Sequence, residues 1–138
     1  MSSKLNVYSD GGARGNPGPA AIGVLICDEQ GEELAEHGET IGETTNNVAE
    51  YTGVIVALEI ARKFKPSEIH FHSDSQLVIS QLSGLYKIKM PHLLELYKQV
   101  KEKEKHFKKV TYTHLRREHE KIRHVDRLVN QALDEAMY

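Results

Sequence analysis

The chain of 138 residues contains very little cysteine and no tryptophan. Its single cysteine, Cys27, cannot form an internal disulfide, which excludes a disulfide-stabilised fold and favours a reducing, cytoplasmic setting. No apolar run approaches the ~20 residues needed to span a bilayer, and no signal-peptide pattern opens the chain. The sequence therefore predicts no membrane association, and no feature indicates a required protein partner.

A strong charge of one sign is also absent, since the net charge is only −2. This balance argues against a generic basic protein that coats nucleic acid. Residues 1–60 carry ten acidic and two basic side chains, whereas residues 98–127 carry eleven basic and five acidic ones. The C-terminal part can favour a polyanion, although we interpret residues 98–109 alone as a solvated helix face.

The length and the apolar content of 39% predict one ordinary globular domain over residues 1–138. Apolar periodicity separates strands from helices along the chain. It predicts strands at 4–9, 20–27, 32–41, 68–73 and 109–115, and helices at 46–64, 75–82, 92–106 and 124–136. A hairpin comes first and strand–helix crossovers follow, which require parallel neighbours. The predicted fold class is α/β, with a mixed sheet flanked by helices.

Residues 8–18 combine one carboxylate, Asp10, with four glycines and a proline. Glycines let a loop turn sharply and expose its N–H groups to a ligand. This stretch alone leaves two interpretations open. Asp10 either begins a turn, as Asp, Gly, Asn and Pro often do, or it belongs to a site for a metal ion and a phosphodiester.

Four acidic residues are spaced as a site would require. Asp10 and Asp74 each follow a predicted strand, and ligand sites in α/β sheets form where parallel strands end. Glu50 lies in the first long helix, and two asparagines four and three residues before it share its helical face. Asp126 falls in the first turn of the predicted last helix. If the two strands are adjacent and parallel, these carboxylates come together.

Crowded carboxylates repel one another unless a cation compensates their charge. Oxygen ligands of this kind suit Mg²⁺ or Mn²⁺. Two such ions about 4 Å apart can clamp an in-line phosphoryl displacement. Each acid by itself is equally well explained as a turn, cap or exposed helix residue, so the hypothesis of a metal site depends on all four together.

The segments that contain these acids resemble the type 1 ribonuclease H family. They read Ser9-Asp10-Gly11-Gly12 with Gly15-Asn16-Pro17-Gly18, Thr44-Thr45-Asn46-Asn47-Val48-Ala49-Glu50, Ser73-Asp74-Ser75-Gln76, and His124-Val125-Asp126-Arg127-Leu128-Val129-Asn130. The resemblance implies the ribonuclease H-like fold, with a five-stranded mixed sheet flanked by helices. It also implies an endonuclease that hydrolyses the RNA strand of RNA–DNA hybrids with two Mg²⁺ ions, for which Mn²⁺ can substitute, leaving 5′-phosphate and 3′-hydroxyl ends.

The resemblance also implies roles for individual residues. Asp10, Glu50, Asp74 and Asp126 match the metal-binding carboxylates, and Glu50 matches a residue that touches a 2′-hydroxyl of the RNA. The positions that match contacts to the hybrid are Gly11, Gly12, Asn16, Thr45, Asn46, Asn47 and Gln76. His119 matches a loop histidine that helps the product leave, with His114 and His124 as competitors.

Two regions depart from the family pattern. The tryptophan-containing basic insertion of many members is absent, and only the short loop 84–91 stands in its place. The stretch before Asp126 is about two residues longer than in similar compact members and has Ile122 where an asparagine is usual. These departures leave open a catalytically weak hybrid-binding module on the same fold. A third possibility is a two-metal nuclease that acts on duplex or junction DNA.

Overall fold

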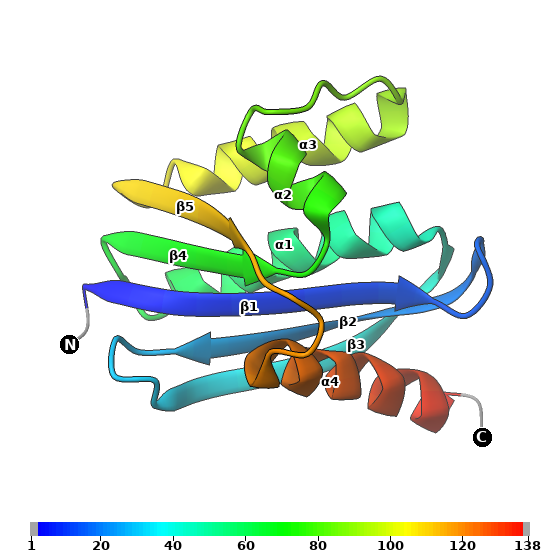
Figure 1. Cartoon of the computed structure of the whole chain (residues 1–138), viewed down its shortest axis with the longest axis horizontal. Helices are drawn as coiled ribbons and strands as arrows, with labels where there is room; N and C mark the ends of the chain where they lie inside the picture. Colours follow the sequence, from blue (N-terminus) through cyan, green and yellow to red (C-terminus); the bar gives the residue numbers. More distant parts are fainter. Residues whose placement is uncertain (1–2, 137–138) are drawn as a thin grey trace.

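The computed structural model describes residues 3–136, in which strands and helices follow one another in the predicted order (Figure 1). The elements are β1 (Lys4–Ala13), β2 (Gly18–Cys27), β3 (Glu33–Thr44), α1 (Asn46–Arg62), β4 (Glu68–Ser73), α2 (Gln76–Leu82), α3 (Pro91–Glu104), β5 (Lys109–His114) and α4 (Glu120–Ala136). No helix in this part of the chain is both long and apolar enough to cross a bilayer.

The five strands form one mixed sheet in the order β3-β2-β1-β4-β5. The pairs β1–β2 and β2–β3 are antiparallel, whereas β1–β4 and β4–β5 are parallel. The strands that precede Asp10 and Asp74 are therefore adjacent and parallel, which is the condition under which their carboxylates come together. Their pairing ends at Tyr8 opposite His72, so Asp10 and Asp74 both follow the last paired residues at the same end of the sheet.

The first strand is longer than predicted. The glycines after Asp10 indicated a loop from residue 10 onward, but β1 continues to Ala13, which pairs with Ala20 of β2. Gly11 pairs with Ile22 within this strand, and α1 crosses it so closely that a Cβ atom there would lie 2.2 Å from the carbonyl oxygen of Ala49. The glycine thus serves close helix packing and not a turn, and Asp10 lies inside the strand.

Two helices cover opposite faces of β1, as side chains of successive strand residues alternate between the faces. Gly11 faces α1, whereas a Cβ atom on Gly12 would meet Val129 of α4 at 3.8 Å. Figure 1 shows α4 on one side of the sheet and α1 on the other, with α3 packed beyond α1. Strands β1 and β2 therefore lie between α1 on one face of the sheet and α4 on the other.

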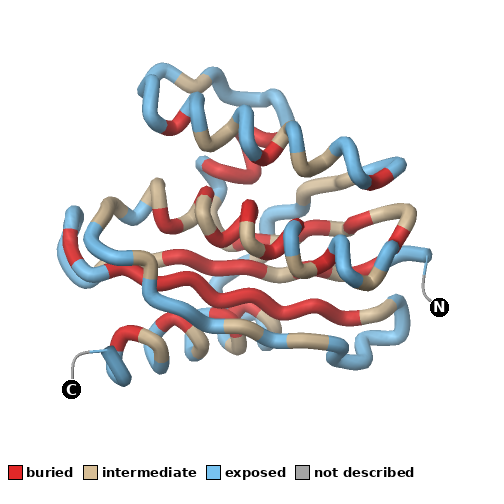
Figure 2. The backbone as a smooth tube through the Cα atoms, turned by 180° about the vertical axis from the view of Figure 1, so that it is seen from behind, coloured by how far each residue is buried: buried red, intermediate tan, exposed pale blue. Residues whose placement is uncertain are grey.

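The main core lies between the sheet and α1, where buried residues follow β1, β2 and β4 (Figure 2). Val7, Ile22, Phe71, Tyr51 and Leu58 are all at most 1% exposed. Burying such a side chain contributes about 1.5–3 kcal/mol, so α1 is held firmly in place. This packing fixes the position of every side chain that α1 presents toward the end of the sheet.

The last helix begins at Glu120, four residues earlier than predicted. The ring nitrogen Nδ1 of His119 accepts a hydrogen bond from the N–H of Lys121 at 3.2 Å. The backbone carbonyl of His119 accepts a second one from the N–H of Arg123 at 2.9 Å. Histidine is not among the usual capping residues, so the sequence pattern did not indicate this start. Asp126 consequently lies in the second turn of α4 and not in the first.

Candidate active site

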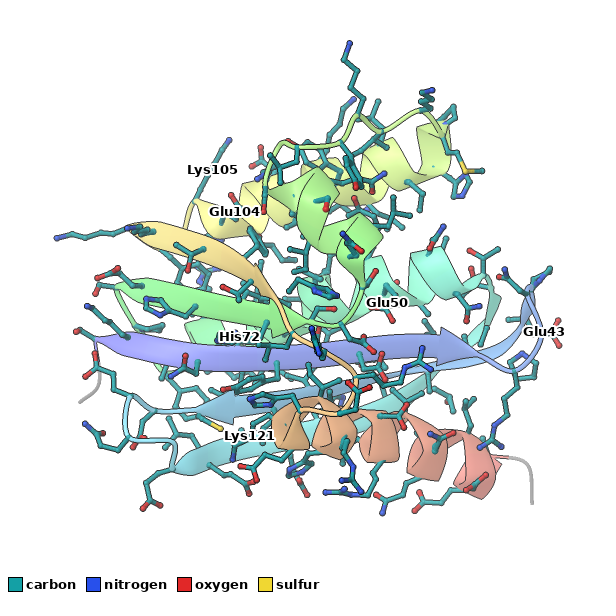
Figure 3. All side chains as sticks on the ribbon, viewed as in Figure 1. Glu43, Glu50, His72, Glu104, Lys105 and Lys121 are labelled. Carbon is teal, nitrogen blue, oxygen red and sulfur yellow. The ribbon has the colours of Figure 1, made fainter. Side chains whose placement is uncertain are left out.

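Three of the predicted carboxylates meet at the C-terminal end of the parallel strands. Asp10 of β1, Glu50 of α1 and Asp74, which follows β4, each offer an oxygen within 4.8 Å of the other two. Glu50 lies beside the end of β4 in Figure 3. The N–H of Gly11 donates to Oδ1 of Asp10 at 3.0 Å and to Oε1 of Glu50 at 3.3 Å. The backbone of β1 thus orients two of the three groups, which we call the three-carboxylate cluster.

Burial makes this cluster costly to ionise. Asp10 is only 8% exposed, and burial is the main reason why its pKa rises to about 7, the hydrogen bond with Glu50 partly opposing the rise. Burial and then the charge of Asp10 raise the pKa of Glu50 well above its usual value. Because several negative charges at this distance are unfavourable, the cluster holds a proton near neutral pH unless a cation takes its place.

Asp74 is partly exposed, with 17% of its side chain accessible to solvent. Burial raises its pKa, while the guanidinium of Arg117, whose Nε lies 3.8 Å from Oδ2, acts in the opposite direction. Arg117 comes from the loop between β5 and α4. The turn after β4 is fixed by the hydrogen bond that the N–H of Ser75 donates to Oγ of Ser73 at 3.1 Å.

Asp126 lies across from the cluster and does not belong to it. Its side chain is on an exposed surface of α4, and its Oδ2 accepts a hydrogen bond from Nδ2 of Asn130 at 3.4 Å. The charge of Asp126 nevertheless acts on both Asp10 and Asp74, whose pKa values it helps to raise. The fourth predicted acid therefore faces the site from the opposite wall.

A groove of about 490 Å³ connects the cluster with Asp126. Its lining residues are Asp10, Gly11, Gly12, Ala13, Arg14, Asn46, Asn47, Glu50, Asp74, Ser75, Arg117, Asp126, Val129, Asn130 and Leu133. On the α1 side, Oδ1 of Asn46 accepts from the N–H of Ala13 at 2.9 Å, and its own N–H donates to Oδ1 of Asn16 at 3.0 Å. These bonds join the β1–β2 hairpin to the start of α1.

The remaining predicted residues lie outside the lining. Oγ1 of Thr45 caps α1 by accepting from the N–H of Val48 at 3.3 Å. Gln76 is exposed at the start of α2. The ring of His119 lies 6.4 Å from that of Tyr8, centroid to centroid. The structure thus brings only some of the predicted hybrid contacts to the groove itself.

Sequence reasoning missed several residues that line the groove, including Arg14, Ser75 and Asn130. One signal was available for Asn130, because it follows Asp126 by four residues and so shares its helical face. No comparable signal pointed to Arg14, whose place depends on how the hairpin and α4 meet.

The cluster fits a hard divalent cation. All three of its donors are carboxylate oxygens, the ligand type that Mg²⁺ and Mn²⁺ prefer. Burial and neighbouring carboxylates raise the pKa values of Asp10 and Glu50, so a bound cation would favour their ionised forms. Within residues 3–136, it is the one group of three or more acidic, histidine or cysteine side chains placed to hold a metal.

Comparisons with known proteins agree with this architecture. Residues 8–132 match the family described as "Reverse transcriptase-like". The chain is 41% identical over 134 residues to a bifunctional protein of Mycobacterium tuberculosis, covering 96% of this chain and 36% of that protein. It is 41% identical over 133 residues to Ribonuclease HI of Halobacterium salinarum, covering 96% of this chain and 66% of the relative.

Solved structures extend the similarity to three dimensions. The crystal structure of LC11-RNase H1 in complex with an RNA/DNA hybrid has a TM-score of 0.91 and 42% identity, covering 97% of this chain and 99% of that one. The H. salinarum RNase H1 structure also has a TM-score of 0.91, at 40% identity, covering 96% of this chain and 98% of that one. The chain spans about a third of the length of the first curated relatives. With its five-stranded mixed sheet and its family match over nearly the whole sequence, the chain belongs to the type 1 ribonuclease H family.

Proposed function

We propose that this protein is a metal-dependent endonuclease that hydrolyses the RNA strand of RNA–DNA hybrids. The observation that carries the proposal is the three-carboxylate cluster at the floor of a groove whose rim presents Asn46 and Asn47. Similarity to an RNase H1 that was solved with an RNA/DNA hybrid supports the choice of substrate. The expected products carry 5′-phosphate and 3′-hydroxyl ends.

Asp10, Glu50 and Asp74 would hold the metal, for which we propose two Mg²⁺ ions, with Mn²⁺ as a substitute. When bound, such ions activate a water molecule and stabilise the leaving oxygen of a phosphoryl displacement. The chain itself orients two of the carboxylates through the N–H of Gly11 and keeps Asp10 away from bulk water. Asp126 adds negative charge from the facing wall, where we propose that it completes the metal site.

Substrate selection would come from the rim of the groove. Asn46 and Asn47 line the groove, and we propose that they hydrogen-bond sugars and base edges in the minor groove. Such contacts read the shape of a hybrid and little of its sequence. We propose further contacts from Gly11, Gly12, Asn16, Thr45 and Gln76, the last three from beyond the lining. Glu50 would touch a 2′-hydroxyl, the group that distinguishes RNA from DNA.

We propose that residues 1–138 act as one ribonuclease H domain in a reducing compartment such as the cytoplasm, where the buried thiol of Cys27 stays unoxidised. His119 would assist product release from its place at the start of α4. Its ring lies 6.4 Å from that of Tyr8, centroid to centroid, and outside the groove lining.

The test is cleavage of a hybrid with a labelled RNA strand in Mg²⁺ or Mn²⁺. The matched pair of variants is Asp10→Asn and Glu43→Gln, because Glu43 is an exposed carboxylate of β3 outside the groove lining. The proposal predicts cleavage by the wild type and Glu43→Gln, and none by Asp10→Asn. It is wrong if neither metal supports cleavage or if Asp10→Asn is fully active. Duplex and junction DNA in the same panel test for a DNA nuclease.

A catalytically weak hybrid-binding module is the second candidate. One observation favours it: Asp126 is exposed and stands outside the three-carboxylate cluster. Tight hybrid binding with a cleavage rate no higher than that of Asp74→Asn would support this candidate. Wild-type turnover well above that background would reject it.

A further inference from the structure

The carboxylate of Asp126 is held by a neighbour on its own helix. Nδ2 of Asn130 donates to Oδ2 of Asp126 at 3.4 Å and to its carbonyl oxygen at 3.0 Å. The two residues are four apart, so they occupy the same face of α4, and both line the groove. The Asn130 amide therefore reaches the one proposed metal ligand that the core does not bury.

Arg14 sets the orientation of that amide. Its Nη2 lies 3.3 Å from Oδ1 of Asn130 and 3.4 Å from the Asn130 carbonyl oxygen. A guanidinium can only donate hydrogen bonds, whereas a carboxamide has an accepting oxygen and a donating NH₂ group. Because Arg14 takes the oxygen, the NH₂ group of Asn130 is left facing Asp126.

Asp134 in turn anchors Arg14, with Oδ1 at 2.6 Å from Nη2. Asp126, Asn130 and Asp134 follow one another at intervals of four residues and form a stripe along α4. Arg14 and Asp134 are 36% and 61% exposed, so their ion pair by itself adds little stability. The ion pair instead affects geometry, because it holds the end of the β1–β2 hairpin against the stripe.

We propose that Asn130, oriented by Arg14, is a positioning residue that keeps the carboxylate of Asp126 turned toward the three-carboxylate cluster. This role rests on the proposed function. Asp10 and Glu50 are held by burial and by the N–H of Gly11, but Asp126 lies at the helix surface and has no such support. Without Asn130 the carboxylate rotates into solvent, and each turnover has to order it again.

A double-mutant cycle on hybrid cleavage tests whether Asn130 acts through Asp126. At saturating Mg²⁺, Asn130→Ala should lower kcat about 10-fold, the usual effect of losing a group that orients a metal ligand. In an Asp126→Ala background the same substitution should change kcat less than about twofold, because the two residues are coupled. Gln131→Ala, an exposed amide on the same turn, serves as the control and should stay within about twofold. Equal losses in both backgrounds, or no loss in either, would overturn the positioning role.

A second readout is independent of activity. In ¹⁵N-labelled protein without substrate, the side-chain NH₂ signal of Asn130 is identified by its disappearance in Asn130→Ala. Arg14→Met and Asp126→Ala should each shift this signal, while Gln131→Ala should not. A wild type that cleaves no hybrid overturns the proposed function, whereas an active wild type with an unresponsive Asn130 signal overturns only the positioning role.

Discussion

The two walls of the groove hold their carboxylates by different means. On the α1 wall, Glu50 lies on a helix that packs closely on β1, and the N–H of Gly11 bonds both Glu50 and Asp10. On the α4 wall, Asp126 is exposed and is held by a surface hydrogen bond from Asn130. The difference indicates that the α1 wall is rigid before any ligand binds, while the α4 wall depends on polar contacts for its geometry.

The largest predicted effect is a difference in cleavage rate between a variant of the α1 wall and a variant of the α4 wall. Asp10→Asn should lower the rate of hybrid cleavage by more than about 10³-fold, because it removes a central ligand of the proposed metal site, worth several kcal/mol. Asp126→Asn should cost only about 10–100-fold, in the range of a supporting residue. Single-turnover rates measured at saturating Mg²⁺ check both values. Equal losses for the two variants would remove the distinction between the walls.

Adjacent glycines allow the packing of the two walls to be compared directly. Gly11→Ala should destabilise the protein by about 3 kcal/mol, because its Cβ atom would lie 2.2 Å from the Ala49 carbonyl oxygen in the backbone of α1. Gly12→Ala should change stability little, since its Cβ atom meets only Val129 of α4, at 3.8 Å. Urea unfolding of both variants is the measurement, and similar values for the two would contradict the account.

Ionisation of the buried Asp10 on the α1 wall should make the free energy of unfolding depend on pH. The pKa of Asp10 rises from 3.8 to about 7 in the folded protein. The associated stability is therefore present below about pH 4 and is lost as the pH rises through about 7. Asp10→Asn, which cannot ionise, should be more stable than metal-free wild type by about 4 kcal/mol at pH 8, and the gain should vanish near pH 4.

Urea unfolding of both proteins in chelator-treated buffer across this pH range tests that prediction. Saturating Mg²⁺ provides the control, because a cation that binds the ionised cluster should restore the wild type at pH 8. If Asp10→Asn raised the free energy of unfolding by the same amount at every pH, ionisation of Asp10 would not be the cause of the increase.

The smallest predicted effect concerns the starts of the two helices. Thr45→Ala should cost about 1 kcal/mol, because the hydroxyl of Thr45 caps α1. His119→Ala should cost less, since at α4 an imidazole replaces the usual hydroxyl or carboxylate cap. Chemical unfolding of the two variants measures the two losses. A larger loss for His119→Ala than for Thr45→Ala would contradict the prediction.

The α1 wall could be predicted from the sequence because its determinants are local. The helical spacing from Asn46 to Glu50 puts both residues on one face. Asp10 and Asp74 each follow a predicted strand of a mixed sheet, where their carboxylates meet if the two strands are adjacent and parallel. The structure brings the three carboxylates together as this pattern indicates. Motif order and periodicity are sufficient here, since each residue lies in or next to a regular element with a clear apolar side.

The α4 wall could not be predicted to the same degree. The start of α4 depends on a histidine cap, which no propensity favours, and the prediction was therefore four residues late. The contact between Arg14 and Asn130 joins residues 116 positions apart through exposed polar groups, for which periodicity carries no signal. Gly11 shows the same limit in the core, because a glycine near a turn motif reads as a loop until the crossing of α1 is known.

Calorimetric titration of the metal-free protein with Mg²⁺ tests the central claim, that the α1 wall holds the metal before substrate binds. Wild type, Glu50→Gln and Asp126→Asn should be compared at pH 8, above the pKa of about 7 for Asp10. We predict that Glu50→Gln loses measurable binding, whereas Asp126→Asn still binds Mg²⁺, with an affinity lower by about 10-fold. Loss of binding in Asp126→Asn, or its retention in Glu50→Gln, would contradict the account.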